Sequence, residues 1–193
     1  DDSIKHLARV LDVEARQFEL LEELADNVEL PVRVTIASGF PKGDKLEFIT
    51  QKVTELGASQ IWGFPADWSV AKWDGKKLSK KVEKLEKIAL GAAEQSKRNL
   101  VPSITLFEKK ADFLAQFNQF DSIVVAYEES AKEGEAAALI QAVSGLEKGA
   151  KLLFIFGPEG GLSPAEIESF EDKGAVIAGL GPRILRAETA PLY

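Results

Sequence analysis

The chain has 193 residues, which is enough for one domain of ordinary size with a small appendage. It is 45% hydrophobic and 28% charged, has no cysteine and has no apolar run near the roughly 20 residues of a membrane helix, so a fibre, a disulfide framework, a thiolate metal site and a membrane span are excluded. A net charge of -7 opposes nucleic-acid binding over the whole surface, although residues 72–98 hold nine basic and four acidic side chains. We expect a soluble, cytoplasmic protein without a metal ion.

The N-terminal third contains one weak and two clear elements. Residues 4–11 suggest a short helix, and the acidic stretch 19–29 has no clear pattern. Residues 32–37 are predicted to form a β-branched strand. Gly43 and Asp44 then open a helix in which Asp44 and Glu47 would form a capping box, and Gly57 ends it.

Strands and helices alternate through the middle of the chain. Strands are predicted at residues 61–64, 103–107 and 122–127, and helices at 76–97, 111–117 and 135–143. The longest of these helices is rich in lysine. It could be a solvated face or a surface that contacts RNA.

The C-terminal part contains the strongest signals. Residues 151–156 (KLLFIF) are an apolar run typical of a central parallel strand, and they lead directly into the glycine loop 157–161. Ser163, Pro164 and Glu166 have the spacing of a helix N-cap, an N1 proline and a capping-box glutamate. A last strand at 175–178 is followed by a second glycine turn, 179–182.

This alternation predicts an α/β fold with a mainly parallel sheet and helices on both sides. Ligands in such sheets bind beyond the carboxyl ends of the strands, where both glycine loops would lie. Neither loop has the spacing of a phosphate-binding P-loop, so nucleotide hydrolysis is disfavoured. Arg183 and Arg186 follow the second turn, and they could form surface salt bridges, with Glu188 for example, or serve a site.

The pairing of FGPEGGLSPAE (156–166) with LGPRILRAETA (180–190) resembles the signature of RsmE-type methyltransferases in the SPOUT superfamily. Segments 40–45 (FPKGDK), 51–52, 55–57 and 94–99 (EQSKRN) resemble earlier motifs of that family in the same order. Residues 4–11 resemble its opening helix, which a small PUA-like β-barrel usually follows. The chain departs from the family at Ala187 and Lys97, and it stops at Tyr193 within the expected last helix.

The resemblance implies a SPOUT methyltransferase domain at 32–193 with a C-terminal deep trefoil knot. It also implies that residues 1–31 are the remnant of a truncated PUA-like RNA-binding domain. The expected activity is methylation of N3 of a uridine in 16S rRNA of the small ribosomal subunit. The donor would be S-adenosylmethionine (SAM), and a homodimer is the family's usual assembly.

The resemblance and the chemistry of the reaction together suggest roles for particular residues. Arg183 or Arg186 would stabilise the developing anion, and Glu94 is a candidate general base. RNA contacts are expected from Lys42, Arg98 and Arg9, whereas the lone His6 is taken as structural or exposed. The cofactor would lie among Ala126, Tyr127, Gly157, Pro158, Glu159, Gly160, Gly161, Leu180, Gly181, Ile184 and Leu185.

Three other functions stay open from the sequence. A different SPOUT enzyme could methylate a ribose 2'-hydroxyl or another base. A non-catalytic RNA-binding ribosome-assembly factor could keep the same fold. A flavodoxin-like nucleotide-binding module is a more distant alternative.

Overall fold

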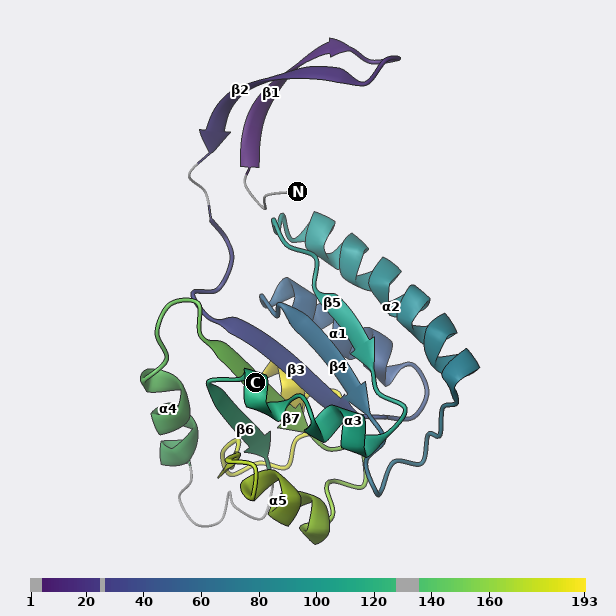
Figure 1. Ribbon diagram of the computed structural model, residues 1–193, viewed down its shortest axis with the longest axis vertical. Helices are drawn as coiled ribbons and strands as arrows, with labels where there is room; N and C mark the ends of the chain where they lie inside the picture. The colour runs from purple at the N-terminus through teal and green to yellow at the C-terminus, as the bar shows by residue number, and fades with distance from the viewer. Residues whose placement is uncertain (1–4, 25–26, 128–135) are drawn as a thin grey trace.

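A computed structural model describes residues 5–24, 27–127 and 136–193 of the protein (Figure 1). Its centre is a six-stranded sheet in the order β5-β4-β3-β7-β6-β8, and every neighbouring pair is parallel. The strands are β3 Arg33–Gly39, β4 Gln60–Phe64, β5 Ser103–Leu106, β6 Ser122–Ala126, β7 Lys151–Phe156 and β8 Val176–Ala178. The α/β class and the parallel sheet are therefore confirmed.

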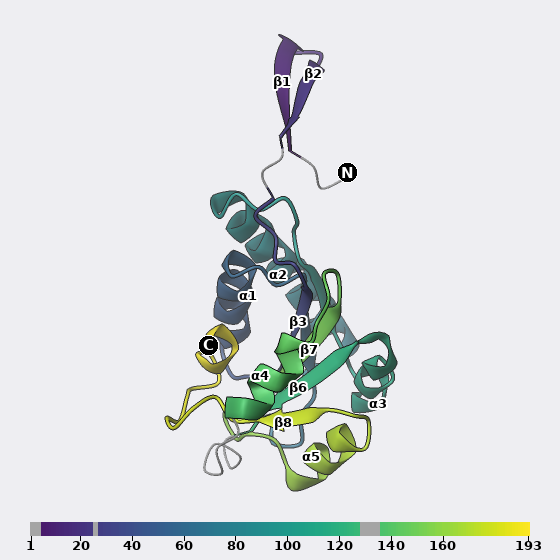
Figure 2. The same cartoon turned by 90° about the vertical axis from the view of Figure 1, so that its left-hand side faces the viewer.

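Helices cover both faces of this sheet (Figure 2). One face carries α1 Lys45–Glu55, α2 Gly75–Gln95 and α4 Ala136–Ser144, and the other carries α3 Lys110–Leu114 and α5 Pro164–Glu171. Short 3-10 turns follow at η1 Phe117–Gln119 and η3 Ala190–Leu192. In the described ranges no helix is long and apolar enough to cross a membrane.

Alternating side chains of β7 build the two halves of the core. Leu153 and Ile155 pack on the face that carries α3 and α5, whereas Phe156 packs against the residues of α1 and α2. A strand covered on both faces needs an unbroken apolar sequence, and this strand has one over nearly its whole length. Its predicted bounds are confirmed, and the other sheet strands lie within two residues of prediction.

The helix predicted at residues 4–11 is wrong. The segment forms β1 Lys5–Asp12, which pairs antiparallel with β2 Gln17–Leu24 in a separate hairpin. The hairpin lies at one end of the molecule, beyond the sheet (Figure 1), and nearly all its residues are exposed. A short apolar sequence does not fix its own secondary structure, and here the ladder with the following segment determines it.

Two local predictions also need correction. The capping box at the start of α1 does not form, because Asp44 has φ -102° and ψ 8°, outside the extended N-cap conformation, and its side chain makes no cap hydrogen bond. Glu47 pairs instead with Lys84 of α2 at 2.6 Å. The helix predicted at 111–117 ends early, at Leu114, and is followed by η1.

Candidate active site

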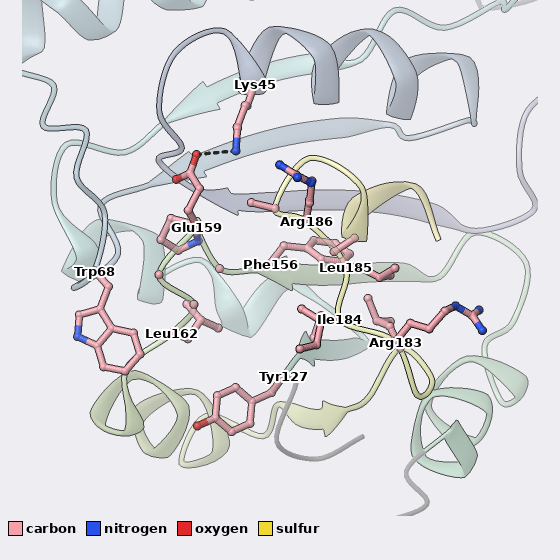
Figure 3. A pocket seen from close by; sticks show the side chains of 18 of the residues that line it. Lys45, Trp68, Tyr127, Phe156, Glu159, Leu162, Arg183, Ile184, Leu185 and Arg186 are labelled. Atoms are coloured by element: carbon pink, nitrogen blue, oxygen red, sulfur yellow. Dashed lines mark ion pairs between the residues drawn. The ribbon is translucent and has the colours of Figure 1, made fainter. Parts of the chain in front are cut away.

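A cavity of about 680 Å³ lies at the carboxyl edge of the sheet, where the loops after β6, β7 and β8 meet (Figure 3). Phe156, Leu162 and Leu180 give it apolar walls, and backbone from the glycine loops completes it. This volume is in the range of small-molecule sites. The full lining is Lys45, Trp68, Ala126, Tyr127, Phe156, Gly157, Pro158, Glu159, Gly160, Gly161, Leu162, Pro164, Leu180, Gly181, Arg183, Ile184, Leu185, Arg186, Ala187 and Ala190.

The loop after β7 folds back tightly on itself, which requires glycine. A Cβ on Gly157 would lie 2.8 Å from the carbonyl carbon of Gly161, and Gly161 itself has φ +79°. The loop leads into α5, where the predicted capping box is confirmed. The side chain of Ser163 accepts the backbone N–H of Glu166, and the carboxylate of Glu166 accepts the backbone N–H of Ser163 at 3.0 Å.

The loop after β8 turns at Gly181, which has φ +86°. Arg183 and Arg186 follow on the cavity lining, and both are exposed. The guanidinium of Arg186 lies on the side of Lys45, whereas that of Arg183 extends away from the glycine loop (Figure 3). A salt bridge between these arginines and Glu188 was one interpretation of the sequence. In the structure, Glu188 instead forms an ion pair with Lys45.

Lys45, at the start of α1, joins the two loops. Its Nζ atom lies 3.0 Å from Glu159 and 2.9 Å from Glu188, and the two carboxylates raise the pKa of Lys45. In turn, Lys45 lowers the pKa of Glu188. Burial alone would raise the pKa of Glu159, but hydrogen bonds from Lys45 and from backbone N–H groups, including that of Lys42, outweigh it and lower the pKa.

A second ionic network joins the start of α5 to the β4–α2 loop. The buried carboxylate of Glu166 accepts the backbone N–H of Asp67 at 2.9 Å and pairs with Lys110 at 2.7 Å. Asp67 also pairs with Lys110 and accepts the Ser163 hydroxyl at 2.6 Å. Burial would lower the pKa of Lys110, but the two carboxylates raise it; the pKa of Asp67 is lowered, chiefly by Lys110. The network fixes the β4–α2 loop, which carries Trp68.

The structure brings together every residue predicted to hold the cofactor, and both predicted arginines. All of them line the one cavity. Lys45 and Trp68 also line it, and the sequence interpretation gave neither a role. Lys45 stood in a quoted motif, FPKGDK, that could have drawn attention to it, whereas nothing in the sequence around Trp68 indicates a site.

Glu94 is not part of this cavity. It is exposed near the end of α2, which returns to the edge of the sheet where the strands begin. The structure therefore gives Glu94 no access to a ligand held in the cavity of the same chain.

Arg98 was predicted to contact RNA, and this is wrong for the conformation described. Its side chain is 4% exposed and donates to the carbonyls of Thr54 at 2.9 Å and Ala58 at 2.7 Å. It also pairs with Glu29, whose carboxylate accepts the backbone N–H of Asn99 at 3.0 Å. A guanidinium satisfied in this way has a structural role, and it anchors the segment that leads into β3.

The other two predicted RNA contacts are on the surface. Lys42 is exposed beside the cavity, and its backbone N–H donates to Glu159. Arg9 lies on the hairpin, 3.7 Å from Glu19, and both side chains are largely exposed. Both side chains lie on the surface, where a partner can reach them.

Fold and cavity together define an α/β domain that binds a small ligand beyond the carboxyl ends of parallel strands. The sequence profile of an RNA methyltransferase domain matches residues 28–193. The ribosomal RNA small subunit methyltransferase E of Bacillus subtilis is 54% identical over 174 residues, which cover 90% of this chain and 68% of the relative. The chain therefore belongs to the RNA methyltransferase family, in the group of the ribosomal RNA small subunit methyltransferases E.

Two solved structures are also similar. The methyltransferase E of Neisseria gonorrhoeae, bound to SAM, superposes with a TM-score of 0.76 at 28% identity over 97% of this chain and 74% of the other. A methyltransferase from Legionella pneumophila, in complex with SAM, gives a TM-score of 0.75 at 27% identity over 99% of this chain and 76% of the other.

Proposed function

We propose that this protein transfers a methyl group from SAM to N3 of a uridine in 16S rRNA of the small ribosomal subunit. The observation that carries the proposal is the single cavity lined by the loops after β6, β7 and β8 and by Arg183 and Arg186. Membership of the methyltransferase E group and the SAM-bound relatives support it.

The cavity fits such a cofactor in size and in chemistry. Ile184, Leu185 and Phe156 offer apolar surface for the adenine ring, and glycine lets the backbone approach closely at Gly157 and Gly161. SAM would supply the reactive methyl group, so the protein must mainly bind, orient and exclude water.

The arginines would supply the electrostatic part of catalysis. Uridine N3 becomes a nucleophile as its proton leaves and negative charge spreads onto the two flanking carbonyl oxygens. A guanidinium held at the cavity stabilises that charge or the adjacent phosphate. Arg186 is the better placed for this role, because its side chain lies on the side of the glycine loop and Lys45 (Figure 3).

A lysine stripe on α2 would guide RNA toward the cavity. Lys77, Lys80, Lys84 and Lys87 recur every three or four residues and Lys81 adjoins Lys80, which places all five along one side of the helix. Contacts link this stripe to the cavity rim. Lys81 lies 4.4 Å above the ring of Trp73, Trp73 packs on Phe40 at 4.3 Å, and Lys42, two residues after Phe40, binds Glu159.

Three features of the family complete the proposal. The C-terminal segment would form the deep trefoil knot, as supported by its return from the β8 edge to pack Ala190 and Leu192 on the α1–α2 side. Residues 1–31 would be the remnant of a PUA-like domain, as supported by the hairpin. The protein would act as a homodimer in the cytoplasm, where its ribosomal substrate lies.

The experiment is transfer of a labelled methyl group from SAM to small-subunit RNA or subunits, with nucleoside analysis of the product. Wild type and Arg186→Ala are compared with Arg33→Ala, an exposed arginine at the start of β3 and away from the cavity. We expect wild type to form 3-methyluridine. Arg186→Ala should reduce the amount of this product at least tenfold, and Arg33→Ala should leave it unchanged. A product methylated on the ribose or on another base would indicate the alternative SPOUT enzyme. Tight RNA binding without any methyl transfer would indicate an assembly factor.

A further inference from the structure

Trp68 is a large aromatic side chain that remains half exposed at the cavity. It is 48% exposed, although its indole lines the same cavity as the glycine loop. A Cβ placed on Gly160 would lie 3.0 Å from Cβ of Trp68, so the absence of a side chain at Gly160 is what allows this contact. Figure 3 shows the indole at the opposite side of the cavity from Arg183.

The backbone that carries Trp68 is held firmly. Asp67, directly before it, donates its backbone N–H to the buried carboxylate of Glu166, and its side chain pairs with Lys110 and Ser163. The backbone N–H of Ser69, directly after it, donates to the carbonyl of Ala66 at 3.0 Å. This anchoring uses the buried carboxylate of Glu166 and the more exposed charges of Asp67 and Lys110 to fix a side chain that faces solvent, which suits a preorganised contact surface.

We propose that Trp68 is the stacking platform for the nucleobase that receives the methyl group. Enzymes that modify a base take it out of its stack, and the exposed base is then held against an aromatic face. Trp68 offers such a face at the cavity, and Lys42 and the α2 stripe supply the charge for the flanking phosphates. This inference rests on the proposed function.

The position of Trp68 favours the RNA base over the adenine of the cofactor. Tyr127 and Leu180 belong to loops after β6 and β8, which would enclose the cofactor, whereas Trp68 comes from the β4–α2 loop outside them. Trp68 is 48% exposed, so its ring is open to a ligand outside the enclosed part of the cavity. An adenine-stacking role would instead require contact with the enclosed part of the cavity.

The test compares wild type with Trp68→Ala, Trp68→Phe and the control Phe48→Ala. Phe48 is a comparable aromatic, 44% exposed on α1, that does not line the cavity. We expect kcat/KM for RNA to fall about tenfold or more in Trp68→Ala, because loss of one base–aromatic stacking contact weakens binding by about that factor. Trp68→Phe should recover most of it, and Phe48→Ala should match wild type. The Kd for SAM, measured by calorimetry, should stay within twofold in every variant.

A second measurement does not depend on activity. Protein loaded with S-adenosylhomocysteine is titrated with a uridine-containing RNA while tryptophan fluorescence is followed. Trp62 is buried, but Trp73 is partly exposed beneath Lys81 of the α2 stripe, so it also responds to RNA. The contribution of Trp68 is therefore the quenching that wild type shows in excess of Trp68→Phe. Equal quenching in both proteins overturns the proposal.

Other outcomes also separate the explanations. A Kd for SAM raised tenfold in Trp68→Ala would assign the indole to the cofactor, and a change in molecular mass in solution would assign it to a subunit contact. Either result overturns the stacking role. If wild type transfers no methyl group but RNA still quenches Trp68, the proposed reaction fails while the base contact stands.

Discussion

Glu166 carries a charge at a position that is 1% exposed, and the candidate site depends on how that charge is compensated. Its carboxylate caps α5, holds the backbone of Asp67 and pairs with Lys110. Removing one partner from a buried ion pair is costly, because the other charge is left without compensation. One side chain thus supports both the glycine loop and the loop of Trp68.

We therefore expect Glu166→Ala to lower the free energy of unfolding by about 3 kcal/mol, measured by urea denaturation. Glu168→Ala, two residues further along α5 at an exposed position, is the matched control and should change it by less than about 0.5 kcal/mol. Similar values for the two variants would show that the network around Glu166 contributes little.

The ion pairs of Lys45 predict a dependence of stability on acid. The folded-state pKa values of Glu159 and Glu188 lie below the ordinary value of 4.5, so the folded state binds these protons less readily than the unfolded state. Their contribution is present above pH 4.5 and is lost as the pH falls through the lower, folded-state values. Urea denaturation should show this loss in wild type and a shallower one in Glu159→Gln. An identical pH profile would contradict the prediction.

At the scale of elements, the sequence predicts best what is decided locally. The run KLLFIF and the capping box at Ser163 and Glu166 contain their own determinants, so both were predicted at the right residues. The hairpin β1–β2 depends on pairing between segments, and its helix-like spacing misled the prediction. Arg98 also misled it, because a basic residue beside a lysine-rich helix gives no sign that it is buried on carbonyl groups.

The site shows the same division between local and long-range determinants. Strand ends marked by glycine motifs predict which loops meet at the sheet edge. The contact of Lys42 and Lys45 with Glu159 requires β3 to lie beside β7, with Ser38 opposite Phe156. That neighbour relation joins residues more than a hundred positions apart, and no local pattern contains it.

The lysine stripe of α2 gives a prediction for RNA affinity. Changing Lys77, Lys80 and Lys87 together to Gln should weaken binding and reduce the slope of log K against log salt concentration by about 2, since each lost phosphate contact contributes about 0.7 for a single strand. A variant with Lys148, Lys151 and Lys173 changed to Gln has the same net charge and is the control. Equal slopes in the two variants would exclude a specific role for α2.

For the whole molecule, the N-terminal segment divides into a separable hairpin and a fixed linker. Nearly every residue of β1 and β2 is exposed, and an isolated two-stranded hairpin adds little stability. Glu29 and Leu30 belong to the domain instead, because Glu29 pairs with Arg98 and Leu30 lies against Gly57. Burial would raise the pKa of Glu29, but Arg98 lowers it.

A protein that starts at residue 27 should therefore match the full chain in its denaturation midpoint. One that starts at residue 31 should lose about 3 kcal/mol or more, because Arg98 is left buried without its carboxylate. Urea titration followed by circular dichroism measures both. If removal of residues 1–26 alone lowered the free energy of unfolding, the prediction would be wrong, because the hairpin would then have to pack on the domain.

Lys45 has one further consequence. A single ammonium group is shared by Glu159, on the loop after β7, and Glu188, on the segment after β8. Movement of either loop away from Lys45 breaks one ion pair and leaves the cation with the other carboxylate, so the two walls of the cavity share one electrostatic anchor. Replacing Lys45 with a neutral residue would therefore remove the counter-ion of both walls in one step.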